Sequence, residues 1–160
     1  MADADLNARV QRLEDMADIQ QLKAQYCAGC DDDHNSDTLL RLFVEGAVWD
    51  FFGVARCEGL PATRKYFDDL RASGLIQNSA HMVTNPNIVI DGDKATGHWR
   101  FIMIYTGNVG DGTTQFRRII GYYQDEFVKK DGQWFFQSLT PMVEENDSYP
   151  VVETLSAPNA

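Results

Sequence analysis

The sequence predicts an α+β fold in which a long N-terminal helix packs across a strongly curved antiparallel sheet. Apolar residues recur at intervals of three and four positions from Asp5 to about Gly29, which is the period of an amphipathic helix. After Gly74 the long segments are instead rich in aromatic and β-branched residues, as strands are. Asp-Gly pairs at 91–92 and 131–132 indicate tight hairpins, so neighbouring strands should pair antiparallel.

The predicted first helix has one apolar face, which should pack against the sheet. That face comprises Leu6, Val10, Leu13, Met16, Ile19, Leu22 and Tyr26. Gly29 is a plausible end for this helix, because glycine readily adopts the backbone conformation that terminates helices.

Two shorter helices are predicted before Gly74. The first fits residues 36–43, with Ser36 or Asp37 as its N-cap. The second fits residues 60–73, with Pro61 in its first turn, where proline is well tolerated. Gly74 follows its last residue and should end it.

Five segments are predicted to be strands. One covers residues 47–55, and four longer ones cover residues 79–91, 94–106, 114–130 and 133–143, with a glycine-rich connection at 106–114. Alternation along the second long segment places Trp99, Phe101, Met103 and Tyr105 on one apolar face, toward the core or a cavity. The opposite, mixed face is a candidate oligomer surface and carries His98, Arg100, Ile102 and Ile104.

Length and charge limit the possible functions. With 160 residues, 44% of them hydrophobic, we expect one domain over residues 1–145. Residues 146–160 should form a C-terminal tail, either disordered or draped over the barrel or a neighbouring subunit. A formal net charge of -10 repels phosphate backbones and anionic membranes, so no nucleic-acid or membrane partner is expected. No apolar run reaches the roughly 20 residues of a bilayer span, and the acidic N-terminus is unlike a signal peptide.

The cysteines do not predict a metal or redox site. Three cysteines, an odd number, suit a reducing cytoplasm better than a secreted disulfide framework. Cys27, Cys30 and His34 share one helical stripe, but only Cys57 could complete a zinc site of four ligands, so no metal is expected. The Cys27–Cys30 pair lies at a helix C-terminus, where the helix dipole does not favour a thiolate, so both thiols should be inert.

The histidines differ in their surroundings. His34 and His98 are expected to be exposed, whereas His81 begins a strand and should share a face with Val83, Asn85, Asn87 and Val89. From this pattern alone, a histidine such as His81 is more often a satisfied core or edge residue than a base. The run Asp31 to Asp33 is ordinarily a solvated helix terminus.

Several segments, taken in order, resemble the SnoaL-like branch of the nuclear-transport-factor-like α+β barrels. This branch includes bile-acid dehydratase, scytalone dehydratase and the γ-hexachlorocyclohexane dehydrochlorinase. The similar segments are "IQQLKAQYCAGCD", "AVWDFFG", "AHMVTNPNIVID", "ATGHW" and "GYYQDEFVKKDGQWFF". The resemblance runs from about Ile19 to Phe136 and implies a cone-shaped barrel, or cystatin-like roll, with the curved sheet wrapped around the long helix.

The resemblance also implies a catalytic site. In the lyases of this family an aspartate at the end of the first helix orients a histidine that removes the substrate proton, and these positions are Asp31 and His81. Tyr26 matches a tyrosine that hydrogen-bonds the substrate carbonyl. Two residues depart from bile-acid dehydratase: its second catalytic aspartate falls at Met103, and its arginine near the last strand has no counterpart in residues 138–145. Tyr26 and Asp31 are about 140° apart on an ideal helix, so both reach one cavity only if the helix loosens, which Gly29 could allow.

These residues together favour a cofactor-independent lyase of the dehydratase or dehydrohalogenase type acting on a hydrophobic cyclic substrate. The expected substrate contacts are Trp49, Phe51, Trp99, Met103 and Met142, while Phe101 and Tyr123 are expected to be core residues. The alternatives are an isomerase or cyclase with the same Asp-His pair, and a non-catalytic binder or small subunit of a ring-hydroxylating dioxygenase. Family resemblance further implies a homo-oligomer, either a trimer or a dimer.

Overall fold

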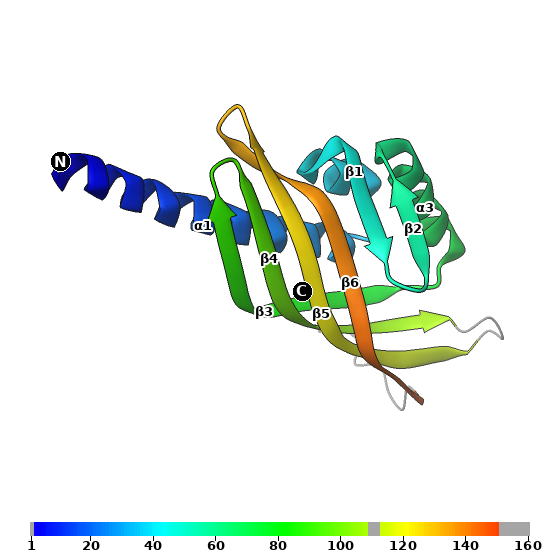
Figure 1. Ribbon diagram of the computed structural model, residues 1–160. Coiled ribbons are helices and arrows are strands. Elements are labelled where there is room, and N and C mark those ends of the chain that lie inside the picture. Colours follow the sequence, from blue (N-terminus) through cyan, green and yellow to red (C-terminus); the bar gives the residue numbers. More distant parts are fainter. Residues whose placement is uncertain (1, 109–112, 151–160) are drawn as a thin grey trace, which may run out of the picture.

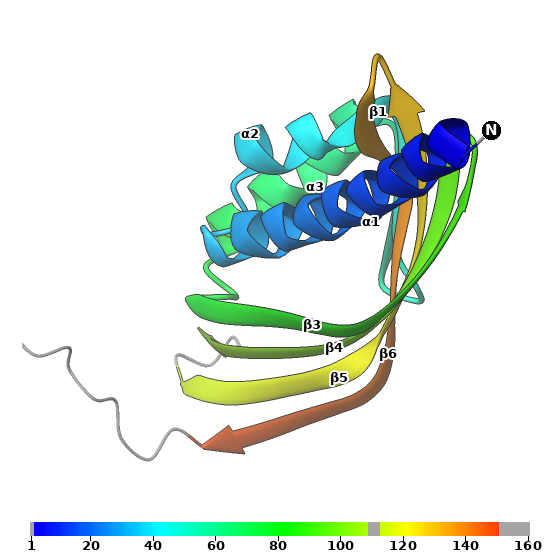
Figure 2. The same ribbon diagram turned by 90° about the vertical axis from the view of Figure 1, so that its left-hand side faces the viewer.

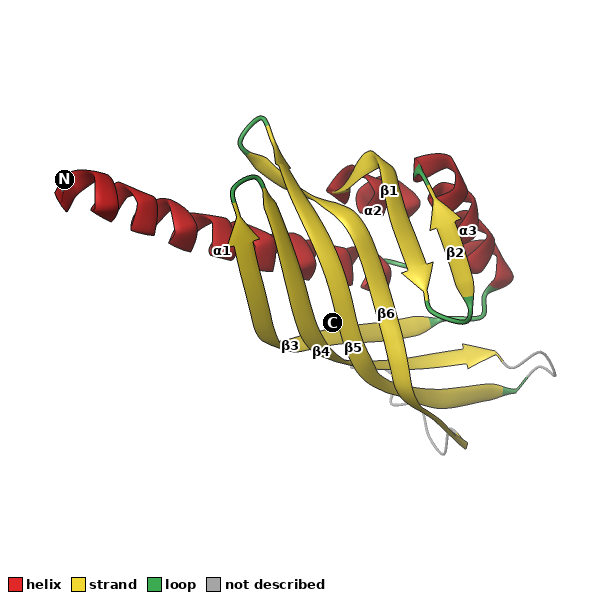
Figure 3. Ribbon diagram, in the orientation of Figure 1, coloured by secondary structure: helices red, strands yellow, loops and turns green. Residues whose placement is uncertain are grey.

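The computed structural model describes residues 2–108 and 113–150 of the chain. Within these residues the helices are α1 (Ala2–Asp31), α2 (Ser36–Leu39) and α3 (Leu60–Ser73), with a short 3-10 turn η1 (Leu40–Leu42) after α2. The strands are β1 (Phe43–Phe51), β2 (Ala55–Glu58), β3 (Asn78–Asp91), β4 (Lys94–Asn108), β5 (Thr114–Lys130) and β6 (Gln133–Pro150). Figure 1 shows the long helix lying across the strands, and Figure 3 separates helices from strands by colour. No described helix is both long enough and apolar enough to cross a lipid bilayer.

The strands form one mixed sheet in the order β2-β1-β6-β5-β4-β3. All neighbouring strands are antiparallel except β1 and β6, which pair in parallel. Strands β3 to β6 bend sharply, and the helices lie on the concave side of the sheet (Figure 2). The predicted α+β fold with a long helix and a curved sheet is therefore confirmed, with one parallel pair that periodicity did not indicate.

Turn residues explain the ends of the long strands. The β5–β6 hairpin turns at Asp131 (φ 51°) and Gly132 (φ 80°), the two positive values that a type I′ turn needs. In the β3–β4 hairpin, Gly92 supplies the positive φ of 57°. Both hairpins lie where the Asp-Gly pairs predicted them.

Helix α1 extends beyond the sheet at its N-terminal end (Figure 1). As a result Leu6, Val10 and Leu13, predicted to face the core, are 55%, 44% and 66% exposed. Burial of the apolar face begins further along, and Ile19 and Leu22 are in the core. The prediction that the first turns of α1 pack against the sheet was wrong, because the apolar repeat of the helix begins before the helix reaches the sheet.

Several predicted boundaries differ from the structure. The helix predicted over 36–43 ends at Leu39 and is followed by η1, and β1 begins at Phe43 instead of residue 47. The strand predicted at 47–55 is two strands, because Gly53 (φ 77°) makes a turn between β1 and β2. The N-cap of α2 is Asn35, whose side chain accepts a hydrogen bond from the Asp37 amide, and not Ser36 or Asp37. Strand β6 continues to Pro150, so residues 146–150 belong to the sheet. The rest of the expected tail, residues 151–160, lies outside the described residues.

Strand β3 contains a β-bulge that changes which residues face inward. Asn85 has φ 54°, and the pairing with β4 shifts between Thr84 and Asn87. Val83 is half-buried on the same side as His81, but beyond the bulge the inward residues are Ile88 and Ile90. The prediction that Asn85, Asn87 and Val89 share the face of His81 was wrong, because the extra residue inverts the alternation.

Candidate active site

A cavity of about 180 Å³ lies on the concave side of the sheet. The end of α1, helix α3 and the inner faces of β1, β4 and β5 supply most of its wall, and β3 contributes His81. The wall is mostly aromatic and aliphatic, which is usual for small-molecule sites. From α3 the side chains of Tyr66, Phe67 and Leu70 face this cavity.

Only some of the residues predicted to contact the substrate line the cavity. Trp49, Phe51 and Met103 line the cavity, but Trp99 and Met142 do not. Trp99 faces inward but lies nearer the β3–β4 turn, opposite Tyr123 in the pairing of β4 with β5. Pro141, which pairs with the inward-facing Tyr123, lines the cavity instead of Met142, because adjacent strand residues face opposite sides.

Phe101 and Tyr123 were expected to be core residues, and they are both buried and part of the cavity wall. Their rings contact each other with centroids 4.7 Å apart. The same inner face therefore packs the core toward the β3–β4 turn and lines the cavity toward the other end of β4.

Asp31 and His81 are in direct contact. The Oδ1 atom of Asp31 is 2.6 Å from Nδ1 of His81. The carboxylate also accepts hydrogen bonds from the His81 backbone amide at 3.0 Å and from Ser79 Oγ at 2.9 Å. Burial alone would raise the pKa of Asp31, but the hydrogen bonds from the ring and amide of His81 outweigh it and the pKa is lowered. The carboxylate thus stays ionised and holds the imidazole with Nδ1 turned away from the cavity.

The two members of this pair have different surroundings. The His81 side chain is 7% exposed and lines the cavity, whereas the Asp31 side chain is 30% exposed and lies outside the cavity wall. Helix α1 remains helical through Gly29 to Asp31, and a Cβ at Gly29 would lie 2.8 Å from Leu39 Cδ2. Gly29 therefore permits close packing of α1 against α2. The expectation that a loosened helix turns Tyr26 and Asp31 into one cavity was wrong, since Asp31 reaches His81 from the outer side.

Tyr26 is buried and lines the cavity. Its hydroxyl oxygen accepts a hydrogen bond from Trp49 Nε1 at 2.9 Å. Burial raises the pKa of Tyr26 well above its ordinary value, so the hydroxyl keeps its proton. It can therefore donate a hydrogen bond to a neighbouring acceptor.

His34 also lines the cavity, although the sequence predicted that it is exposed. It is 6% exposed, and its ring stacks on Phe67 with a centroid distance of 6.1 Å. The backbone turns at Asp33 (φ 53°) and His34 (φ 52°), two successive left-handed residues that fold the chain back after α1. Burial, followed by the nearby charge of His81, lowers the pKa of His34 to about 4, so the ring is neutral at pH 7. The only indication of this turn in the sequence was the run of Asp, His and Asn residues, which adopt the left-handed conformation more readily than most residues.

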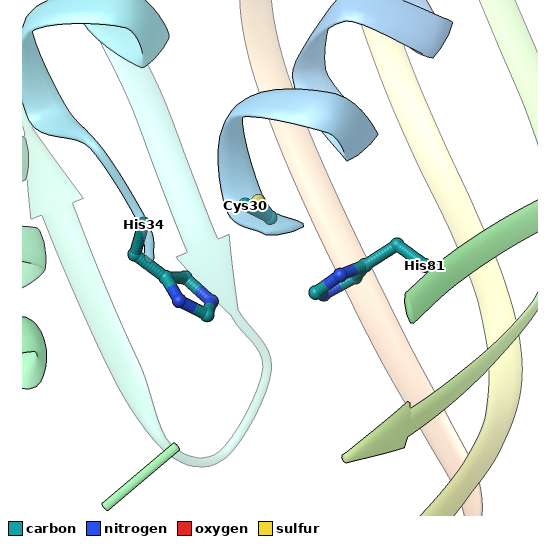
Figure 4. Close-up of side chains that lie close together, drawn as sticks. All are labelled: Cys30, His34 and His81. Atoms are coloured by element: carbon teal, nitrogen blue, oxygen red, sulfur yellow. The ribbon is translucent and has the colours of Figure 1, made fainter. Parts of the chain in front are cut away.

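Cys30 is the third potential ligand in the cavity wall. Possible ligand atoms of Cys30, His34 and His81 all lie within 4.8 Å of one another (Figure 4). Burial raises the pKa of Cys30 and raises that of Cys27 to about 11, so both thiols are protonated, as predicted for unreactive cysteines. Cys27 and Cys57 are free thiols and are not members of this group.

Comparison with known proteins identifies the family and agrees with the fold. Residues 11–140 match a family model described as a SnoaL-like domain. No curated protein matches the chain in sequence. Among solved structures, a type 2 hexachlorocyclohexane dehydrochlorinase (LinA) is 20% identical, with a TM-score of 0.81 over 95% of this chain and 99% of that one. A protein from Novosphingobium aromaticivorans proposed to be a scytalone dehydratase is 21% identical, with a TM-score of 0.75 over 95% and 99% of the two chains.

A further structure from Novosphingobium aromaticivorans is described as an NTF2-like protein with a cystatin-like fold. It is 22% identical, with a TM-score of 0.67 over 88% of each chain. At such identities the three structural matches show a shared fold and nothing finer.

Proposed function

The chain belongs to the SnoaL-like family, and from this premise we propose that it is a lyase that removes a proton from a hydrophobic cyclic substrate. The family fold is shared with dehydrochlorinase and dehydratase enzymes. The observation that carries the proposal is the contact of His81 Nδ1 with the Asp31 carboxylate at 2.6 Å, with the same imidazole in the wall of an apolar cavity. In a Ser-His-Asp triad the histidine is the base and the aspartate orients it. His81 and Asp31 correspond to these two residues, and no serine nucleophile accompanies them among the described residues that line the cavity.

In the proposed reaction, Nε2 of His81 takes a proton from a substrate carbon. The electron pair of that C–H bond forms a double bond to the neighbouring carbon, from which a hydroxyl or halide leaves with its bonding electrons. Asp31 stabilises the imidazolium formed in this step, because its carboxylate already accepts from Nδ1. The imidazolium then gives its proton to a departing hydroxide, which leaves as water, or to solvent when a halide leaves as the anion.

Tyr26 is the proposed stabiliser of negative charge that develops on a substrate oxygen. Its oxygen accepts from Trp49, so its own O–H is the group that donates. It lines the same cavity as His81 and keeps its proton at neutral pH. Preorganised donors of this kind act strongly where water is excluded.

The cavity restricts the substrate. Its volume of about 180 Å³ is close to that of an engineered 150 Å³ protein cavity that binds benzene. We therefore propose a substrate with one six-membered ring and small substituents, such as a halogenated or hydroxylated ring. A four-ring steroid would extend out of this cavity. The wall offers apolar contacts from residues such as Trp49, Phe51 and Met103.

An isomerase or cyclase would use the same proton abstraction and differ only in where the proton returns, so product analysis separates it from a lyase. A non-catalytic binder would take up the same ligands without converting them.

Substitution of His81 tests the proposal. We expect thermal-shift screening with single-ring halogenated and hydroxylated compounds to identify ligands, since binding raises the melting temperature of the folded protein. On a ligand that is turned over, His81→Gln should lower kcat by about 10²–10⁴-fold. His98→Gln is the matched control, because His98 is exposed on the outer face and stacks on Tyr122. Undiminished turnover by a folded His81→Gln protein would reject His81 as the base.

We propose that the protein assembles as a homo-oligomer, a dimer or a trimer, through the outer face of its sheet. Met82, Ile102 and Ile120 are cross-strand neighbours on β3, β4 and β5, and the first two are 43% and 41% exposed. Such a row of apolar side chains suits burial against another copy. Its free buried thiols fit the cytoplasm, which we propose as its compartment.

A further inference from the structure

Cys30, His34 and His81 come from three parts of the chain and meet in the cavity wall. Cys30 lies in the last turn of α1, His34 follows in the turn after that helix, and His81 is on β3 (Figure 4). We propose that these three side chains bind one zinc ion, with the fourth coordination position facing the cavity.

The distances suit such an ion after small side-chain rotations. The possible ligand atoms lie within 4.8 Å of one another. In a tetrahedral zinc site with Zn–S of about 2.3 Å and Zn–N of about 2.0–2.1 Å, ligand atoms are about 3.3–3.6 Å apart. Each pair therefore has to approach by about 1.5 Å at most, which rotation about the side-chain bonds provides. Thiolate and imidazole ligands favour zinc over magnesium or calcium, which prefer oxygen.

His81 is oriented as a metal ligand is. Its Nδ1 is 2.6 Å from the Asp31 carboxylate, which leaves Nε2 for the ion. Metal-bound histidines almost always donate their other ring N–H to a carboxylate, a carbonyl or water, which sets the tautomer and increases ligand basicity. Asp31 would be that outer partner, itself held by the His81 amide and Ser79.

His34 is directed into the cavity at a conformational cost. It and Asp33 adopt φ values of 52° and 53°, and non-glycine residues in that region cost on the order of 1 kcal/mol each. His34 is 6% exposed, and its ring stacks on Phe67. The His34 ring lines the cavity, and a ring nitrogen lies within 4.8 Å of possible ligand atoms of Cys30 and His81. A metal ion among these three side chains would contact that nitrogen.

Charge balance also supports a divalent ion. On binding, the Cys30 thiol releases its proton to solvent and becomes a thiolate. Together with the Asp31 carboxylate it supplies two negative charges, which the two positive charges of zinc neutralise.

Zinc binding has a consequence that rests on the proposed function. The Nε2 electron pair that binds the ion is the one that would accept the substrate proton. The same cavity thus cannot hold zinc on His81 and use His81 as a base, so stoichiometric zinc should inhibit turnover and a chelator should restore it. The existence of the site does not depend on this consequence.

Cobalt(II) is the probe for the site, because it replaces zinc and gives a near-ultraviolet thiolate charge-transfer band. We expect the reduced wild-type protein to bind one Co²⁺ with this band, and Zn²⁺ to abolish it by displacing cobalt. Cys30→Ser should lose the band, and His34→Gln should weaken binding by at least about tenfold, the smallest effect seen even for outer-sphere changes. Cys27→Ser and His98→Gln are the matched controls and should bind as the wild type does.

A measurement on the wild-type protein tests the ligand set without relying on variants that fail to fold. Zinc-edge X-ray absorption of the loaded wild type should show one sulfur and two imidazole ligands. Absence of the thiolate band, a sulfur-free zinc spectrum, or unchanged binding by folded Cys30→Ser would overturn the proposal. All these readouts are independent of turnover. If folded His81→Gln keeps its activity while the cobalt band is present in the wild type, the lyase proposal fails and the zinc site stands.

Discussion

His81 owes its orientation to a single carboxylate on a different element of the fold. Asp31 contacts both the ring and the backbone amide of His81, so one side chain sets the strand position and the ring orientation together. Ser79 adds a third donor to the same carboxylate. Because these donors hold the pKa of Asp31 low, the carboxylate is ionised at neutral pH despite its partial burial.

A second ion pair at the residue scale, Lys23 with Asp125, is fully buried. The Nζ atom is 2.8 Å from Asp125 Oδ2 and 3.2 Å from the centre of the Tyr123 ring. Burial lowers the pKa of Lys23 and raises that of Asp125, and their mutual attraction opposes both shifts. Asp125→Ala should lower the free energy of unfolding by about 3–5 kcal/mol, because it leaves a buried ammonium without its partner. Urea denaturation measures this loss.

Asp69→Ala is the control for that substitution. It breaks the exposed i,i+4 pair of Lys65 with Asp69, which solvent screens, so it should barely change the free energy of unfolding. An Asp125→Ala protein as stable as the Asp69→Ala protein would contradict the claim that the buried pair matters.

At the element scale, α1 is attached to the β5–β6 hairpin through one buried carboxylate. Asp15 accepts hydrogen bonds from Lys129 Nζ at 2.7 Å and Trp134 Nε1 at 2.9 Å. Burial alone would raise the pKa of Asp15, but these hydrogen bonds and the charge of Lys129 outweigh it, so the pKa is lowered. The unfolded carboxyl titrates near pH 3.9. The stabilisation by Asp15 is therefore present above about pH 4 and is lost as the pH falls through the lower folded pKa.

Asp15→Asn tests this attachment. It should lower the free energy of unfolding at pH 7 by about 1–3 kcal/mol and make stability less dependent on pH in the acid range. Chemical denaturation at pH 7 and at pH 3 measures both effects. Asp18→Asn, on an exposed position of the same helix, should change neither. An Asp15→Asn protein with wild-type acid dependence would refute the role given to the carboxylate.

At the scale of the whole molecule, strands β3 to β6 bend around the helices. Their concave face lines the cavity, and their convex face is exposed on the outside of the protein. The inner face carries Phe101 and Met103, and the outer face carries Ile102 between them in sequence. Both functions proposed for the sheet, ligand binding and association, thus follow from the alternation along one strand.

Association through the outer face predicts that Ile102→Lys dissociates the oligomer. Ile102 pairs with Met82 on one side and Ile120 on the other, so a charge there would be buried among apolar residues of the interface. Sedimentation velocity should show a shift from a dimer or trimer to a monomer with the fold retained. Thr96→Lys, an exposed outward-facing position nearer the start of β4, is the control. A monomeric wild type at micromolar concentration would contradict the proposed assembly.

The sequence by itself determined where most helices and turns lie and which face of β4 points inward. Pro61 and Gly74 bound the third helix as predicted, and the Asp-Gly pairs mark both long hairpins, because backbone conformation at these residues is a local property. The contact of Asp31 with His81 matched the pair implied by family resemblance. Alternation also predicted correctly that Trp99, Phe101 and Met103 face inward.

Only the tertiary structure decided which inward residues meet the cavity. Periodicity specifies the face of an element and does not say where along that face another element packs, so Trp99 lies beyond the cavity and Phe101 lines it. One bulge at Asn85 inverted the faces of β3, and two left-handed residues brought His34 inside. The cavity and the Cys30–His34–His81 group arise from contacts between residues distant in sequence, which no local pattern encodes.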